Sequence, residues 1–116
     1  MLIPSKTTDR YWLVAIDENH YFHKPQRERE SGKWLLFAEW PEIDHWWPII
    51  RDALLSGNLG HSAKAATGKE NPKAADSETG VICIFTDDFN DTSDILRVAD
   101  ALRQLGITQK LVYILD

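Results

Sequence analysis

The sequence predicts an α+β fold, a mostly antiparallel five-stranded sheet with two helices on one face, in the order ββαββαβ. The first observation is the apolar run Val81–Phe85, which ends in the polar step Thr86–Asp88 and is typical of a strand buried on both faces. The second is a set of shorter segments rich in β-branched and aromatic residues. The third is a pair of segments with helical periodicity, and two such helices can cover one face of the sheet.

The composition indicates one domain, residues 1–116, with a single core. The chain is 43% hydrophobic and 27% charged, which is typical of a globular protein. A net charge of −5 argues against broad nucleic-acid binding, which needs a basic face, but allows a small basic pocket. We find no signal peptide and no apolar run near the ~20 residues that span a membrane. The single cysteine, Cys83, fits a reducing cytoplasm, and we interpret it as a buried apolar residue rather than a nucleophile.

The first third of the chain contains two predicted strands. Residues Met1–Arg10 are polar and are expected to form a loose lead-in. Tyr11–Ile16 and Lys33–Phe37 are rich in β-formers and are predicted to be strands. Between them, His20–Gly32 carries mixed charges and a proline, which favours a surface loop.

The first predicted helix follows the second strand. Asp44 is a suitable N-cap, and with that start Pro48 falls in the first turn. A proline deeper in the helix would cost ~3 kcal/mol. Gly57 is placed to end the helix in a left-handed conformation. The apolar face then contains Trp47, Ile50 and Leu54.

The second half of the chain supplies the remaining elements. A short third strand is expected within Leu59–Ala66, and Thr67–Thr79 is expected to be a loop long enough for a lid or an insertion. The central strand follows. Asp91 can cap the second helix and Gly106 can end it, before a last strand at Leu111–Leu115.

Neither the histidines nor the aspartates predict a metal site. His20 and His23 have a suitable spacing, but no third ligand stands at a characteristic distance in the sequence. Asp87, Asp88 and Asp91 do not form a recognisable cation-binding loop, and we interpret them as a strand end and a helix cap. The glycine-rich phosphate loops are absent from the sequence. We therefore expect no metal and no cofactor.

Two lysines are the strongest functional candidates. Lys33 opens one predicted strand and Lys64 lies in another, so both can project from neighbouring strands on one face of the sheet. Two ammonium groups in a hollow repel each other and require an anion. A phosphate-sized ligand fits, with Thr67, Thr86 or Tyr113 as hydrogen-bond partners. The alternative, which stays open, is that each lysine is solvated and pairs with a surface carboxylate.

Four segments carry a resemblance to a known family. Gly32–Phe37 (GKWLLF), Leu59–Lys64 (LGHSAK), Val81–Phe89 (VICIFTDDF) and the final Tyr113 resemble the basophilic-leukaemia-expressed protein family. The similarity runs from about Ser31 to the end of the sequence. It implies a fold similar to that of the cap-binding translation initiation factor. The sequence departs from the family pattern after Tyr113, where Ile-Leu-Asp replaces Lys-Pro-Asp.

A weaker similarity is to the bacterial phosphothreonine lyases. In those enzymes an early strand carries Lys-x-His and a later short strand carries a catalytic lysine. Lys33 and Lys64 fall at the matching places, but Leu35 occupies the position of the histidine that acts as general acid. Loss of a general acid typically costs ~10²–10⁴-fold in rate. His61 could replace it if the fold brings His61 into the pocket.

These observations lead to one expected function and two alternatives. We expect a cytoplasmic domain that binds a phosphorylated, nucleotide-like small molecule or a phosphorylated peptide, with Trp12, Trp34 or Trp40 available to stack on a base. The first alternative is a phosphothreonine lyase with Lys64 as base and Lys33 on the phosphate. The second is a protein-interaction module that uses an apolar strand edge or Trp46–Trp47. The expected ligand-binding residues are Lys33, Lys64, Thr86, Trp34, Tyr113 and His61.

Overall fold

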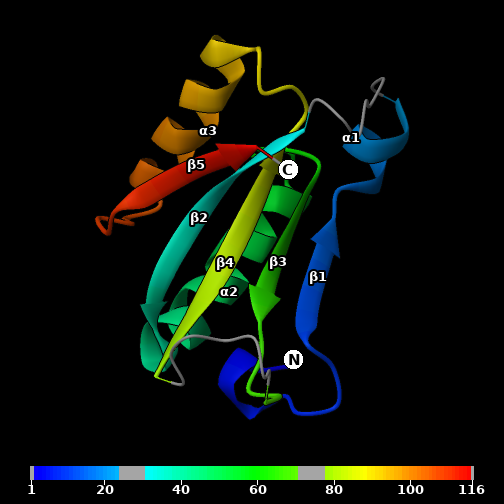
Figure 1. The fold of residues 1–116 in the computed structure, drawn as a ribbon. Helices are drawn as coiled ribbons and strands as arrows, with labels where there is room; N and C mark the ends of the chain where they lie inside the picture. Colours follow the sequence, from blue (N-terminus) through cyan, green and yellow to red (C-terminus); the bar gives the residue numbers. More distant parts are fainter. Residues whose placement is uncertain (1, 24–30, 71–77, 116) are drawn as a thin grey trace.

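A computed structural model describes residues 2–23, 31–70 and 78–115 of the chain and has the predicted α+β character (Figure 1). The elements run in the order η1 (Pro4–Lys6), β1 (Trp12–Ile16), α1 (Glu18–His23), β2 (Gly32–Glu39), α2 (Trp40–Leu55), β3 (Ser62–Ala66), β4 (Thr79–Thr86), α3 (Thr92–Gln104) and β5 (Leu111–Leu115). Across the described ranges, no helix combines the length and apolar character that a membrane crossing requires.

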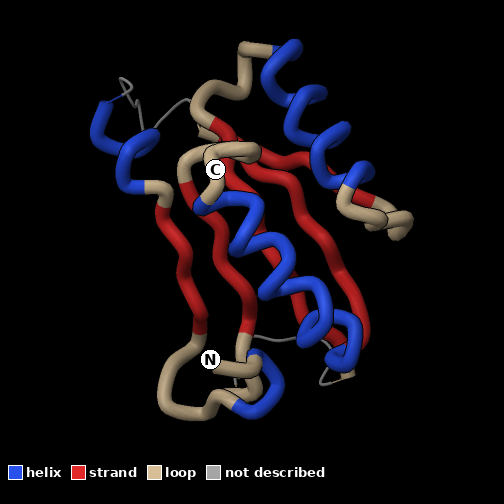
Figure 2. The backbone as a smooth tube through the Cα atoms, turned by 180° about the vertical axis from the view of Figure 1, so that it is seen from behind, coloured by secondary structure: helices blue, strands red, loops and turns tan. Residues whose placement is uncertain are grey.

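The five strands form one sheet in the order β1-β3-β4-β2-β5. All four strand pairings are antiparallel, which confirms the predicted antiparallel sheet. β4, which contains the apolar run, is the central strand. Figure 2 shows the two long helices, α2 and α3, on the same side of the sheet, while the short α1 lies beyond the β1 edge.

The core lies between the sheet and α2. On the sheet, Leu36, Ile82 and Ile84 are fully buried, and on α2 Ile43 and Ile50 face them and are equally buried. Removing each such side chain from water contributes ~1.5–3 kcal/mol to folding. This burial holds α2 against β1, β2, β3 and β4 and leaves the other side of the sheet without a long helix (Figure 1).

The start of α2 corrects one prediction. The helix begins at Trp40 rather than after Asp44, and Pro41 occupies the first turn, where a missing N–H is tolerated. Pro48 therefore lies inside the helix. Asp44 accepts hydrogen bonds from the backbone N–H and the hydroxyl of Ser5 instead of capping the helix. The expected loose lead-in is thus partly wrong, because these bonds fasten η1 to α2.

The predicted loop between the first two strands is also partly wrong. Its first residues, His20–His23, belong to α1, whose first turn is held by a hydrogen bond from the His20 N–H to the Asp17 carboxylate, 3.2 Å. The predicted order ββαββαβ lacks this helix. Residues 24–30 of the predicted loop, and 71–77 of the predicted loop Thr67–Thr79, lie outside the described residues. Thr79 itself belongs to β4.

The other helix boundaries agree with the sequence. Gly57 follows α2 with φ of +84°, and Gly106 follows α3 with φ of +103°, both in the region that glycine adopts most readily. The Asp91 carboxylate accepts a hydrogen bond from the Asp94 N–H at the start of α3, 3.1 Å. These local signals are strong because a cap needs only residues close together in the chain.

Candidate functional site

The side of the sheet opposite α2 carries the two candidate lysines. Side chains alternate between the two faces of a strand, and residues paired across strands share a face. One row of residues paired in this way crosses all five strands, and in it Lys64 of β3 lies between its partners on β1 and β4. Its members are Val14, Lys64, Cys83, Leu35 and Val112.

Further rows on either side of it complete the surface that we call the open face. Lys33 lies directly opposite Phe85 on one side and Ile114 on the other. The full set of open-face positions is Trp12, Val14, Ile16, Lys33, Leu35, Phe37, Glu39, Ser62, Lys64, Ala66, Thr79, Val81, Cys83, Phe85, Val112 and Ile114. Among these described positions there are two lysines and one carboxylate, that of Glu39, which lies opposite Thr79 at the other end of β2 from Lys33.

The two ammonium groups approach the same aromatic ring. The Nζ of Lys33 lies 5.4 Å from the centre of the Phe85 ring, and the Nζ of Lys64 lies 5.7 Å from it. Lys64 also lies over Trp12, with its Nζ 4.1 Å from that ring centre. Attraction between a cation and a ring face contributes ~0.5–1 kcal/mol where water has access. Within the described ranges no carboxylate forms an ion pair with Lys64.

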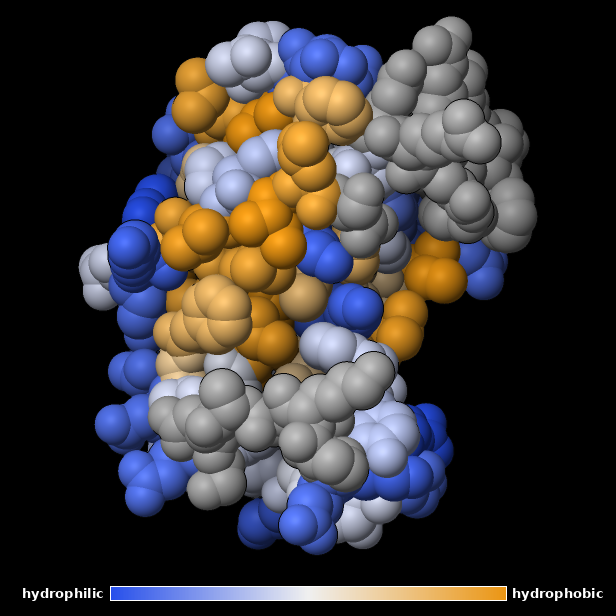
Figure 3. Space-filling view, in the orientation of Figure 1, coloured by the Kyte–Doolittle hydropathy of each residue, from blue (hydrophilic) through white to orange (hydrophobic). Residues whose placement is uncertain are grey.

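The rim of the open face is apolar and exposed. Val14 is 61% exposed, Phe37 55%, Ile16 42% and Ile114 38%. In Figure 3 hydrophobic residues cover much of this side of the molecule, and hydrophilic residues interrupt them near the middle. The sheet face that solvent reaches usually carries polar side chains, so this surface is more apolar than a solvated sheet face usually is.

The helix-covered side of the sheet contains a second group of predicted site residues. The hydroxyls of Thr86 and Tyr113 are hydrogen-bonded at 2.6 Å, and Thr86 is fully buried. The Tyr113 ring packs edge-on against Trp34, with ring centres 5.0 Å apart, and the Trp34 indole N–H donates to the Ile95 carbonyl of α3. Gly32 is required beneath this ring, because a Cβ there would lie 2.1 Å from the Tyr113 oxygen.

The environment of Tyr113 keeps its phenol protonated. Burial raises the pKa of the phenol above its usual value, while the hydrogen bond with Thr86 acts in the opposite direction. The negative charges of Asp88 and Asp94 raise the pKa further. Tyr113 is therefore a neutral hydrogen-bonding group with a structural partner.

His61 lies at the end of the sheet, just before β3. Its ring is buried and stands 5.7 Å from the Phe85 ring, centre to centre. The Nδ1 atom is hydrogen-bonded to the Ser62 hydroxyl at 2.9 Å, and Nε2 lies 3.4 Å from the Ser31 hydroxyl. Ser62 is an open-face residue, two positions from Lys64. His61 thus orients a hydroxyl at the margin of the lysine site.

The structure divides the predicted site residues between the two faces. Lys33 and Lys64 share the open face, but β4 separates their strands, so the expectation that these strands are neighbours was wrong. Thr86, Trp34 and Tyr113 lie on the helix-covered side. The sheet stands between these two groups, so a ligand seated on the lysines would not contact the second group.

The remaining hydrogen-bonding and tryptophan candidates have structural positions. Thr67 is buried, and its hydroxyl donates to the Arg10 carbonyl. Trp40 packs against the core, and Trp47, only 3% exposed, belongs to it. Of the three tryptophans expected to stack on a base, Trp12 is the one on the open face.

Sequence reasoning missed three groups near the site. Phe85 was assigned to the central strand without a separate role, although it alternates with Ile84 and so faces the opposite side. Ser62 gave no signal of its own. The contact between His20 and Asp87, with the His20 Nε2 2.8 Å from a carboxylate oxygen, links α1 to the end of β4.

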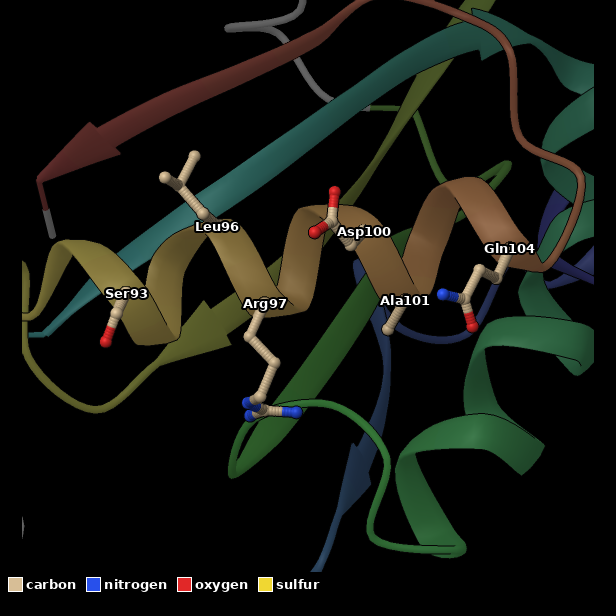
Figure 4. Close-up of a pocket in the computed structure, with 6 residues that line it drawn as sticks. All are labelled: Ser93, Leu96, Arg97, Asp100, Ala101 and Gln104. Atoms are coloured by element: carbon tan, nitrogen blue, oxygen red, sulfur yellow. The ribbon is translucent and has the colours of Figure 1, made fainter.

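No group of three metal-ligating side chains occurs in the parts of the chain that the structure describes. The His23 side chain lies outside them. A hollow of about 510 Å³ lies along the outer surface of α3 and is lined by Leu96, Arg97 and Asp100 (Figure 4). Arg97 donates to the carbonyls of Asn58 and Leu59, which indicates a structural role for this residue. This hollow contains neither lysine.

A comparison with protein families gives one match over most of this fold. The family described as basophilic leukemia-expressed protein Bles03 matches residues 24–113. That range includes β2, β3, β4 and most of β5, and both long helices. It therefore includes both candidate lysines, Phe85 and Tyr113. The chain belongs to the family of basophilic leukemia-expressed protein Bles03.

Proposed function

We propose that the open face binds a phosphorylated ligand, with its phosphate between Lys33 and Lys64 above the Phe85 ring. One observation carries this proposal, the approach of both ammonium groups to one ring in a surface that is mainly apolar. Two like charges so placed repel each other, and both attract a dianion that lies between them. Phosphate carries enough charge and several acceptor oxygens for this task.

The neighbouring groups supply further recognition. The Ser62 hydroxyl, oriented by His61, offers an additional hydrogen bond to a phosphate oxygen. Trp12 lies under Lys64 and offers a ring for a base if the ligand is a nucleotide. Stacking of one base on an aromatic side chain contributes ~1–3 kcal/mol. A nucleotide-like ligand would be in keeping with the cap-binding-factor fold that we propose for this sheet and its helices.

A thermal-shift screen with inorganic phosphate and phosphorylated metabolites tests the proposal. A ligand at 100 times its dissociation constant adds ~2.7 kcal/mol of stability, which is a measurable rise in melting temperature. The double variant Lys33→Ala/Lys64→Ala should lose this rise. Lys69→Ala is a matched control. The Nζ of Lys69 also lies over an aromatic ring, 4.6 Å from the centre of the Tyr11 ring, but outside the open face. Equal shifts in the double variant and the wild type would reject the proposal.

A phosphothreonine lyase is the second candidate, favoured by the position of His61 beside the Phe85 ring. Lys64 would take the α-proton, the Cβ–O bond would break with its electrons leaving on the phosphate, and His61 would protonate that oxygen. The peptide would then lose the mass of phosphoric acid. A phosphothreonine peptide incubated at high protein concentration without this mass loss excludes the lyase and leaves binding as the function.

A further inference from the structure

We infer that the open face takes a peptide segment in which apolar side chains flank a phosphorylated residue. This inference rests on the proposed function and adds the class of ligand. The phosphate would occupy the two lysines, and the flanking side chains would cover the exposed rim. The partner is thus a protein with a phosphorylated apolar segment.

The extent of the apolar surface favours a peptide over a small molecule. The strands are ~4.8 Å apart, so the four spacings of the sheet give a face roughly 19 Å wide. A single phosphate covers only the part around Phe85. The exposed residues lie further out, Val14 and Ile16 on edge strand β1 and Ile114 on edge strand β5. A ligand that covers both sides of the lysines must be longer than a phosphorylated metabolite.

The charge of the open face favours one of three larger partners: a second copy of the chain, an anionic membrane or a phosphorylated peptide. A second copy of the chain, packed face to face, would bring together two lysines and one carboxylate, that of Glu39, from the described open-face positions of each copy, so positive charge would remain in excess. An anionic membrane is attracted by clusters of four to eight basic residues, whereas this face presents two on a chain of net charge −5. A peptide with one phosphate and apolar neighbours matches both the charge and the hydrophobicity of the face.

The inference is tested with two exposed rim residues. Val14→Ser and Phe37→Ser remove apolar contact without adding charge, and Leu96→Ser is the control because Leu96 is 55% exposed on α3. The probe is a fluorescent phosphothreonine peptide with leucine and valine on both sides, shown by mass to stay intact. Its unphosphorylated form, inorganic phosphate and phosphatidylserine vesicles are measured beside it. We expect Phe37→Ser to lower the affinity for the phosphopeptide at least ~tenfold and Leu96→Ser to leave this affinity unchanged. The affinity for inorganic phosphate should be equal in the wild type and all three variants.

The possible results separate this inference from the proposed function. One result would overturn the peptide inference alone. In it, phosphate affinity depends on both lysines, but phosphopeptide affinity is unchanged in Phe37→Ser and Val14→Ser. Equal affinity for the phosphorylated and unphosphorylated peptides overturns both, because the phosphate then contributes nothing. Binding to the vesicles but not to the phosphopeptide also rejects the peptide as occupant.

Discussion

The two faces of the sheet are made by the same strands but differ in what covers them. On β2, Leu36 is fully buried beneath α2, whereas its neighbour Phe37 is 55% exposed on the open face. Both faces are largely apolar. Folding explains the apolar residues under the helices, because they form the core. It does not explain the exposed apolar residues of the open face, such as Val14 and Phe37, which in a solvated sheet would be polar. The apolar residues there, and the lysines among them, are therefore the part of the molecule to which we assign function.

The largest expected effect comes from comparing neighbours on the two faces. Leu36→Ala should lower the free energy of unfolding by about 2–5 kcal/mol, since it removes a fully buried side chain and leaves a cavity. Phe37→Ala should change it by less than about 0.5 kcal/mol, as expected for an exposed position. Urea denaturation of both variants measures the difference. A similar large loss for Phe37→Ala would mean that the open face is a second core surface rather than a binding face.

Tyr113→Phe tests the hydrogen bond on the helix-covered side. The variant removes the partner of a fully buried Thr86 hydroxyl, and an unsatisfied buried group costs about 1–3 kcal/mol. We expect a lower urea midpoint with unchanged phosphate affinity, because the ring lies on the opposite face from the lysines. A variant that folds normally but loses phosphate binding would contradict this division of the two faces.

The same phenol predicts a pH dependence of stability. Burial raises the folded-state pKa of Tyr113 above the reference value of 10.0, so the unfolded chain releases this proton at a lower pH than the folded chain. The contribution to stability is complete below pH 10 and is lost as the pH rises through the folded-state pKa. Wild-type stability should therefore fall more steeply above pH 10 than that of Tyr113→Phe. Urea midpoints at several alkaline pH values measure the two slopes, and identical slopes would contradict the raised pKa.

Local features of the fold could be read from the sequence. The central strand, the cap at Asp91 and the ends of both long helices depend on residues within a few positions of each other. The start of α2 was missed for a specific reason. Asp44 has the chemistry of a cap, but its partner is Ser5, which is 39 residues away and gave no local signal.

The candidate site depended on strand order, which the pattern did not reveal. Period-two alternation could have separated Lys33 from Trp34, since adjacent residues on a strand face opposite sides. Strand order alone places Lys33 and Lys64 on either side of Phe85. The role of Phe85 follows from that order, and a run of five apolar residues gives no indication of it.

The two lysines are also expected to contribute little to stability, and this expectation sharpens the comparison of the faces. Lys33→Ala and Lys64→Ala should each change the free energy of unfolding by less than about 1 kcal/mol, because the attraction to Phe85 and Trp12 is offset by repulsion between the two ammonium groups. Added phosphate should stabilise the wild type more than either variant. Chemical denaturation with and without phosphate measures both effects. A loss above about 2 kcal/mol without phosphate would make the lysines structural, whereas a small loss with reduced phosphate stabilisation separates function on the open face from stability on the helix-covered face.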